Sequence, residues 1–169
     1  ITESYDDSWG GTHAVSAFKW ESGSSVFQVT QYDNDENWII AQNDSTNDWN
    51  ADLWSKFEWT WDNDALYYCQ SAYDAASEQD AIDTASADAS DMAAGCGGFS
   101  WTELRTDLGI SGSYDDNWGS QHDINAFVWT SGASAFHISQ SDRENNWMVA
   151  QNDSSNSWNP DLWSKFEWA

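Results

Sequence analysis

Apolar and polar residues alternate with a two-residue period through the first third of the chain. In the stretch 14–21, Phe18 and Trp20 fall on one side while Lys19 and Glu21 fall on the other. Such alternation is typical of a half-buried β-strand. Turns rich in Gly, Ser, Asn and Asp separate the alternating runs. The pattern predicts four strands, over residues 14–21, 26–32, 37–43 and 53–61.

The same pattern returns later in the chain. Residues 42–59 reappear as 151–168 with three of eighteen positions changed, and a constant offset of 109 aligns 4–59 with 113–168 at 34 identities in 56 positions. Two copies indicate a duplicated folding unit rather than a solenoid, which needs at least three repeats. Neither copy has a sustained 3.6-residue apolar period. We therefore expect an all-β fold, in which two tandem four-stranded antiparallel repeats form a pseudo-twofold sandwich or barrel.

The segment between the copies has a different composition. The expected organisation is a first β repeat over 1–61, a connecting segment over 62–112 and a second β repeat over 113–169. Alanine and other good helix formers near 72–81 predict one short helix. Cys69 and Cys96 lie 27 positions apart without a metal-type CxxC spacing, which favours one disulfide over a metal site. Two reduced, buried thiols are the alternative.

Composition narrows the range of partners. The chain carries 29 acidic and 5 basic residues, for a formal net charge of −24. A field of this sign repels phosphate groups, so nucleic acid and anionic membranes are not expected partners. The charge fits a solvated acidic surface or cation binding. The disulfide and the acidic surface favour a secreted, periplasmic or cell-surface location.

Tryptophan is unusually frequent. Fourteen are present, and twelve of them form six matched pairs between the two copies. Indole rings can close a small core, and six per copy also leave rings for a stacking surface. We expect most of them in the core and one or two per copy at a binding site.

One group of acids and histidines recurs in both copies. Carboxylates are hard oxygen ligands for calcium, and a histidine six residues later adds a nitrogen that suits a transition metal. The spacing matches no established metal loop, and the alternative is that the acids cap a turn while the histidine is held by hydrogen bonds. The candidate metal ligands are Asp6, Asp7, His13, Asp115, Asp116 and His122.

A second recurring group surrounds an indole with amides and carboxylates. An indole stacks on the CH-rich face of a sugar while amides and carboxylates take its hydroxyls, and the same polar residues also build turns for local reasons. The candidate ligand-binding residues are Asn43, Asp44, Asn47, Trp49, Asn50, Asn152, Asp153, Asn156, Trp158 and Asn159.

Several blocks also support a resemblance. In order they are YDDxWGxxH, IAQND, WNxDLWSKFEW, LYYCQSAYDAA and GCGGF. Together the blocks resemble uncharacterised secreted or lipoprotein domains of Gram-negative bacteria. The resemblance implies a secreted, β-rich module and brings no activity with it. The second copy departs from the pattern because no cysteine segment follows Trp168.

These observations favour a secreted acidic binding protein that recognises carbohydrate or another small polar ligand. The first alternative is a metal-ion binding protein, with calcium or a transition metal as the bound ion. The second is a glycoside hydrolase, in which paired acids such as Asp44 and Asp52 act as acid and base on the glycosidic bond. No GxSxG, HExxH or phosphate-loop motif is present, so no catalytic residue is assigned and a non-enzymatic role is expected.

Overall fold

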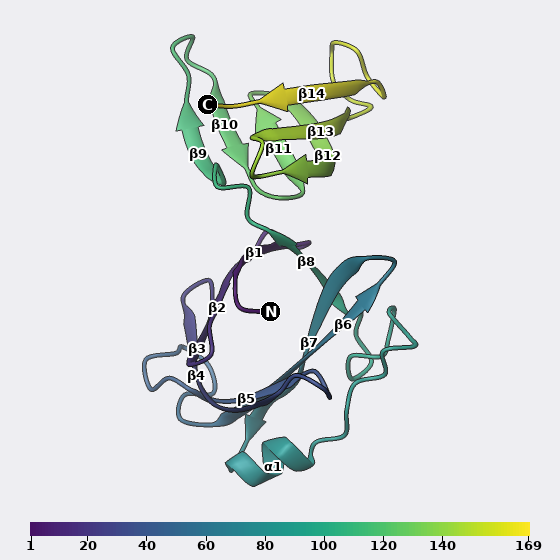
Figure 1. The fold of residues 1–169 in the computed structure, drawn as a ribbon. Coiled ribbons are helices and arrows are strands. Elements are labelled where there is room, and N and C mark those ends of the chain that lie inside the picture. Colours follow the sequence, from purple (N-terminus) through teal and green to yellow (C-terminus); the bar gives the residue numbers. More distant parts are fainter. The chain divides into compact units, whose positions relative to one another are not determined.

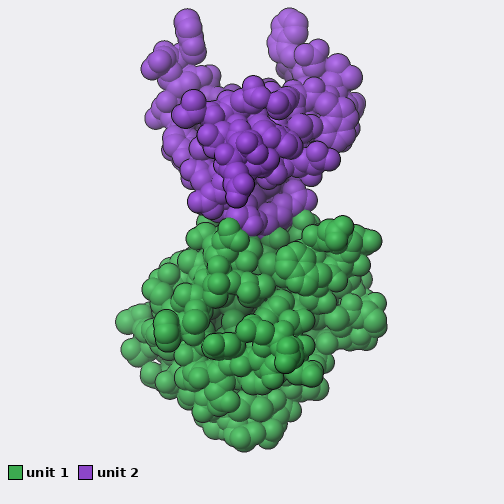
Figure 2. Space-filling model, viewed as in Figure 1, with its two compact units in different colours: residues 1–104 green, residues 105–169 purple.

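The computed structural model describes all 169 residues and consists of fourteen strands and one short helix. The chain divides into two compact units, residues 1–104 and residues 105–169 (Figure 2). The all-β class expected from the sequence is confirmed. No helix has the length and apolar character needed to cross a bilayer.

The first unit is a closed barrel whose strands follow one another in chain order from β1 to β8 (Figure 1). Every pairing that involves consecutive strands is antiparallel, so the chain runs up and down around the barrel. The elements are β1 (Ser4–Asp7), β2 (Thr12–Val15), β3 (Lys19–Ser22), β4 (Ser25–Asp33), β5 (Trp38–Asn43), β6 (Trp54–Asp62), β7 (Ala65–Ala75), α1 (Glu78–Asp83) and β8 (Thr102–Thr106).

The second unit is a single antiparallel sheet of six strands in the order β14-β13-β12-β11-β10-β9. Its strands fall at the positions of β1 to β6 when the offset of 109 is applied, so the sequence repeat is also a repeat of strands. The strands are β9 (Gly112–Asp115), β10 (Gln121–Ile124), β11 (Val128–Ser131), β12 (Ser134–Asp142), β13 (Trp147–Asn152) and β14 (Trp163–Glu167).

Each copy therefore has six strands, and the four-stranded repeat is not confirmed. The stretch expected as one strand over 14–21 is split into β2 and β3 by a turn at Ser16. The Ser16 hydroxyl accepts hydrogen bonds from the backbone N–H groups of Phe18 and Lys19, which holds the turn. Phe18 is consequently exposed at the turn instead of sharing the core with Trp20.

A single sandwich or barrel built from the two copies is not confirmed either. The barrel contains strands of the first copy together with β7 and β8, which come from the connecting segment 62–112. The sheet of the second copy contains the six strands β9 to β14. The connecting segment is thus a structural part of the first barrel, and the six strands of the second copy form a sheet of their own.

The expected helix exists, but it is shorter and begins later than the composition suggested. Residues 72–75 belong to β7, whose pairing with β6 runs along the whole of β7 and outweighs the helix preference of alanine. Ser77 is the N-cap of the helix, and its hydroxyl oxygen accepts a hydrogen bond from the Asp80 N–H. Glu78 and Asp80 in the first turn complement the positive helix end.

Aromatic rings fill the barrel interior. Trp20 is fully buried and stacks on Phe57 with ring centroids 4.4 Å apart, and Phe27 meets the edge of Phe57 at 4.9 Å. Ile39 and Trp59 complete the central layer of the same cluster. Burial of large rings supplies most of the hydrophobic stabilisation that such a small barrel can obtain.

The expected disulfide is confirmed. Cys69 of β7 is bonded to Cys96, and it ties the loop that follows α1 to the barrel wall. No free cysteine remains. Disulfides persist in oxidising surroundings, so the bond indicates an extracellular or otherwise oxidising compartment.

Removal of this bond should destabilise the first unit. Replacement of both Cys69 and Cys96 by serine frees a loop that spans 27 residues, and the expected loss in free energy of unfolding is about 3 to 4 kcal/mol. Urea unfolding followed by circular dichroism measures this loss. Hydrogen exchange supplies the control, because faster exchange in the double variant should be confined to residues 1–104. Equal stability of the double variant and the wild type would contradict the prediction.

Candidate ligand-binding loops

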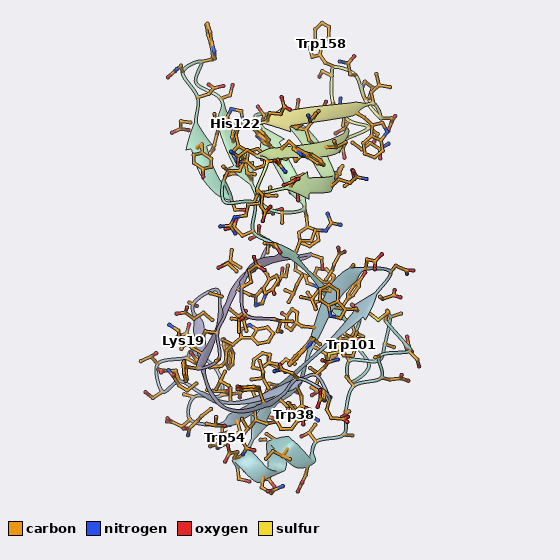
Figure 3. All side chains as sticks on the ribbon, viewed as in Figure 1. Lys19, Trp38, Trp54, Trp101, His122 and Trp158 are labelled. Atoms are coloured by element: carbon orange, nitrogen blue, oxygen red, sulfur yellow. A yellow bond between two sulfur atoms is a disulfide. The ribbon has the colours of Figure 1, made fainter.

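Three turns of each copy lie at one end of its sheet. Because neighbouring strands run in opposite directions, the turns after β1, β3 and β5 share one end of the barrel, and those after β9, β11 and β13 share one end of the second sheet. Figure 1 shows the turn after β9 and the loop after β13 on the same side of that sheet. Trp49 lies in the loop after β5, and Trp158, labelled in Figure 3, lies in the loop after β13.

These turns present indole rings to solvent. Trp49 and Trp158 are 83% and 84% exposed, whereas the Trp20 ring in the core is completely buried. The turn after β1 carries Trp9 and the turn after β9 carries Trp118, with exposures of 77% and 92%. We refer to Trp9, Trp49, Trp118 and Trp158 as the exposed indoles. Each exposed indole presents a flat apolar face on which the apolar face of a ligand can stack.

The loop that carries Trp49 is held by buried amides. The Asn43 side chain donates to the backbone carbonyls of Asn50 and Tyr73 at 2.8 and 3.0 Å, and it accepts from the Ser55 hydroxyl at 2.6 Å. Asn47 forms a two-way bond with the backbone of Val26, at 2.8 Å in each direction. Asn43 and Asn47 are therefore buried, and their side chains hold the backbone of the loop.

The second copy repeats this scaffold with one difference. Asn152 donates to the carbonyl of Asn159 at 2.8 Å and accepts from Ser164 at 2.7 Å. Asn156 bonds both backbone groups of Ala135. No hydrogen bond corresponding to the one between Asn43 and Tyr73 is formed, because the second sheet lacks a strand equivalent to β7.

Asp44 and Asp153 are the first residues of the same loops, directly after β5 and β13. The Thr46 N–H and hydroxyl, followed by the Gln28 amide, lower the pKa of Asp44. A bond of 2.8 Å from the His137 ring, together with bonds from Ser155, lowers the pKa of Asp153. Both carboxylates are held in the charged form, which suits a turn and is the opposite of what a general acid requires.

The tip of each loop is exposed to solvent. Asn50 and Asn159 adopt left-handed backbone conformations, with φ of 52° and 50°, and both side chains are exposed beside an exposed indole. Asparagine tolerates this conformation better than most residues. The backbone conformation therefore also explains why asparagine occupies these positions. Of the ten candidate ligand-binding residues, four have exposed side chains: Trp49, Asn50, Trp158 and Asn159.

Trp9 and Trp118 are exposed but are not among the candidate binding residues expected from the sequence. Each stands alone among polar and glycine residues, in DDSWGG and DDNWGS respectively. An isolated indole in a tight turn has no apolar neighbours to cover it, and that local context was the available signal. Gly10 follows Trp9 with φ of +87°, which a glycine adopts without strain.

The proposed metal ligands form a hydrogen-bonded chain instead. His13 Nε2 lies 3.0 Å from Asp7 Oδ2, and the Trp20 indole N–H donates to His13 Nδ1 at 3.1 Å. Since Nδ1 accepts, the ring proton is on Nε2 and is donated to Asp7. The other Asp7 oxygen accepts from the N–H groups of Trp9 and Gly11. Both ring nitrogens of His13 are thus occupied.

The second copy repeats the chain more loosely. His122 lies 3.3 Å from Asp116, and Trp129 donates to His122 at 3.0 Å. At the position of Gly11, where a Cβ would lie 2.6 Å from an Asp7 oxygen, the second copy has Ser120. Of the remaining candidate ligands, Asp6 is buried and Asp115 is exposed. No group of three or more His, Cys, Asp or Glu side chains is placed to hold a metal ion.

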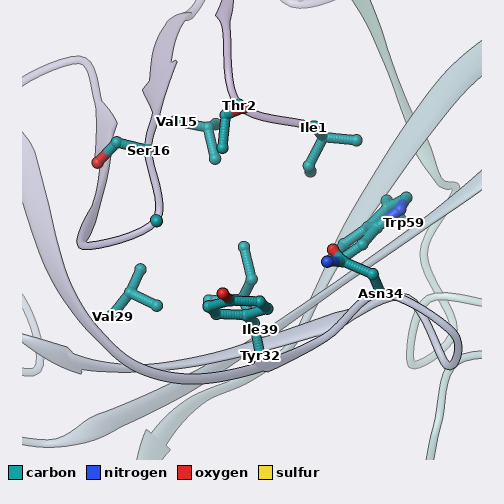
Figure 4. A pocket seen from close by; sticks show the side chains of 10 residues that line it. Ile1, Thr2, Val15, Ser16, Val29, Tyr32, Asn34, Ile39 and Trp59 are labelled. Carbon is teal, nitrogen blue, oxygen red and sulfur yellow. The ribbon is translucent and has the colours of Figure 1, made fainter.

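A small apolar pocket of about 120 Å³ lies at the other end of the barrel (Figure 4). The turns after β2 and β4 contribute Ser16 and Asn34, and Val15, Ile39 and Trp59 line its wall. Ligand pockets are commonly about 300 to 1,000 Å³. The volume is too small for a sugar or cofactor, so this pocket is not the candidate site.

Comparison with protein-family models, curated proteins and solved structures yields no match. The function is therefore argued from the residues and geometry described above.

The buried amides allow a matched stability test. Asn43→Ala leaves the carbonyls of Asn50 and Tyr73 and the Ser55 hydroxyl without their partner, and buried groups of this kind cost about 1–3 kcal/mol. Asn152→Ala loses one fewer bond. We expect the first substitution to lower the free energy of unfolding by more than the second, as measured by urea unfolding. Equal losses would contradict the assigned role of the Tyr73 carbonyl.

Asp7 provides a pH test. Burial raises the pKa of Asp7, but the hydrogen bonds from His13, Gly11 and Trp9 outweigh it, so the pKa lies below its ordinary value of 3.8. A depressed pKa stabilises the fold above 3.8, and this contribution is lost as the pH falls through the lower folded-state value. The stability advantage of the wild type over Asp7→Asn should therefore be full at pH 6 and shrink below pH 4 in urea unfolding. A difference that stays constant with pH would contradict this role.

Proposed function

We propose that this protein is a secreted, non-enzymatic binding protein that recognises carbohydrate through the exposed indoles. The observation that carries the proposal is the exposure of two tryptophans at one end of each unit, between 77% and 92%; in the loops of Trp49 and Trp158, buried asparagines hold the backbone. Sequestering an indole from water is worth roughly 2 to 3 kcal/mol. Two copies that differ at 22 of 56 aligned positions both keep this unfavourable exposure.

Rigid loops suit such a role. Asn43, Asn47 and their counterparts fix the backbone on either side of the indole, so a ligand does not have to order the loop when it binds. A preformed loop saves the conformational entropy that an unstructured loop would lose. Asn50 and Asn159 stand beside the rings and can exchange hydrogen bonds with hydroxyl groups.

Charge narrows the class of ligand. At a net charge of −24 the surface repels sulfated, phosphorylated and uronic acid sugars. Neutral or amino sugars are the better fit, because their CH faces stack on indoles and they carry no negative charge. The duplicated loops also favour a polymeric or multivalent glycan, since a second contact with the same molecule increases the overall affinity.

Binding fits the loop chemistry better than cleavage. A glycosidase needs one carboxyl group with a raised pKa as the acid, whereas Asp44 and Asp153 both have lowered pKa values. The metal-binding alternative has no supporting group of ligands in the structure. Secretion is supported by the disulfide, which requires an oxidising compartment to form and persist.

A glycan array with the labelled full chain, followed by calorimetry on the best neutral polysaccharide, tests the proposal. Substitution of Trp49 and Trp158 by alanine should weaken binding at least about tenfold, which corresponds to about 1.4 kcal/mol of lost stacking. Trp61→Ala is the matched control, because that ring is exposed on a strand outside the loops and should leave the affinity unchanged.

Three outcomes would count against the proposal: an array without binding, equal affinity of the loop variants and the wild type, and a Trp61→Ala variant that loses as much affinity as they do.

A further inference from the structure

A second pocket of the first unit, of about 320 Å³, lies between β7 and the segment that follows α1. Figure 1 shows this segment beside β6 and β7. The volume falls within the range of about 300 to 1,000 Å³ that is common for ligand pockets. Apart from Ser71, Ser86, Asp88 and Asp91, every residue that lines the pocket is alanine or glycine, and these small residues leave the space open.

One wall of this pocket is fixed to β6 by a buried ion pair. The Lys56 ammonium donates to the Thr84 carbonyl at 3.0 Å and to the Ser86 hydroxyl at 3.4 Å. Glu58 lies 3.5 Å from the same ammonium and accepts from the Ala87 N–H at 3.0 Å. The two buried charges are therefore paired with each other and hold the wall in place.

The opposite wall is fixed to β7 by the disulfide between Cys69 and Cys96. Cys96 and Phe99 exchange backbone hydrogen bonds across the tight turn that lines the pocket. The Asp88 N–H donates to the Gly95 carbonyl at 2.9 Å, which joins the two walls. A Cβ at Gly95 would lie 1.9 Å from the Asp88 carbonyl oxygen, so only glycine fits there. The pocket is thus preformed, and a ligand does not have to order it.

Ser71 indicates that the pocket is a binding site. Among the buried side-chain nitrogen and oxygen atoms of the structure, only the Ser71 hydroxyl has no hydrogen-bond partner. Buried polar groups are almost always paired, so an exception calls for an explanation. Ser71 lies in β7 at a shift of register against β6, and it lines the pocket. A bound molecule with polar groups supplies the partner that the fold does not.

Two carboxylates set the chemistry of that molecule. Asp88 Oδ1 accepts from the Ser90 N–H and hydroxyl, and Asp91 Oδ1 accepts from the N–H groups of Ala93 and Ala94. The bonds from Ser90 lower the pKa of Asp88, so this group is charged at neutral pH. These bonds use one oxygen of each carboxylate and leave the other for a ligand. No lysine, arginine or histidine lines the pocket.

We infer that this pocket binds a small organic cation that carries a primary ammonium group, held by the carboxylates of Asp88 and Asp91 and by the Ser71 hydroxyl. An ammonium group has three N–H donors, and its hydrogen bonds to carboxylates are stronger than those between neutral groups. Calcium takes six to eight oxygen ligands, and no group of three or more acidic, histidine or cysteine side chains is placed to hold a metal ion. The exposed indoles take no part in this site, which is independent of the proposed carbohydrate binding.

Calorimetry of the full chain with 1,4-diaminobutane tests the proposed site. In about 0.1 M salt, which screens exposed charges beyond about 10 Å, binding should saturate at one molecule per chain. Butane-1,4-diol has the same length without the charge and should not bind. Tetramethylammonium has the charge without N–H donors and should bind at least about tenfold more weakly.

Paired variants separate the pocket from the acidic surface. Replacement of both Asp88 and Asp91 by asparagine removes the charge and should weaken diamine binding at least about tenfold. Asp33→Asn is the matched control, because Asp33 also accepts from the backbone of its own turn but does not line the pocket, and its affinity should equal that of the wild type.

Ser71→Ala supplies a readout that does not depend on the carboxylates. This variant should weaken diamine binding at least about threefold. Its unfolding temperature without ligand should not fall, because the Ser71 hydroxyl makes no hydrogen bond within the fold.

Four results would overturn the proposed site. They are the absence of saturable diamine binding, equal affinity for the diamine and either control ligand, a loss in Asp33→Asn as large as in the double variant, and wild-type affinity in Ser71→Ala. Calcium chloride is titrated in parallel, and calcium binding tighter than that of the diamine would also overturn it, because the pocket would then be a metal site.

Discussion

The indole N–H of Trp20 is the polar group on which the barrel depends. It lies in a ring cluster where water does not reach, and an unpaired N–H there would cost about 1–3 kcal/mol. His13 accepts this hydrogen bond at Nδ1 and donates one from Nε2 to Asp7, which in turn accepts from the backbone of the turn after β1. The centre of the core and the turn that carries Trp9 are therefore connected through a single chain of hydrogen bonds. The chain also gives a structural reason for the recurrence of an acid and a histidine in both copies.

The duplication separates the effect of sequence from the effect of neighbours. The segment WSKFEW is central and buried as β6, and it is an exposed edge as β14. Lys56 illustrates the difference, because its ammonium group donates to the Thr84 carbonyl of the segment after α1 and lies near Glu58. The ammonium group of Lys165 donates to Glu167 and lies over the Trp147 ring. The connecting segment thus completes the first copy in ways that its own residues cannot.

Buried and exposed side chains are divided clearly within the loops. Buried amides such as Asn43 and Asn47 satisfy backbone groups at the base, while the indole and Asn50 stand at the tip. Binding sites are commonly carried by loops on a rigid scaffold. The exposed indoles occur in both copies in the same kind of turn, so the capacity to stack is a property of the repeated unit.

The sequence by itself determined the β class, the duplication, the disulfide and the loops that carry Trp49 and Trp158. Each of these follows from local signals: a two-residue alternation, a constant offset, two cysteines and clusters of turn-forming residues. The tertiary structure decided the rest. A hydroxyl contact of Ser16 divided one expected strand into two, and pairing with β6 drew residues 72–75 into a strand despite their alanines. Burial of Lys56 and exposure of Lys165 depend on which strand lies beside them, and alternation along one strand carries no information about its neighbour.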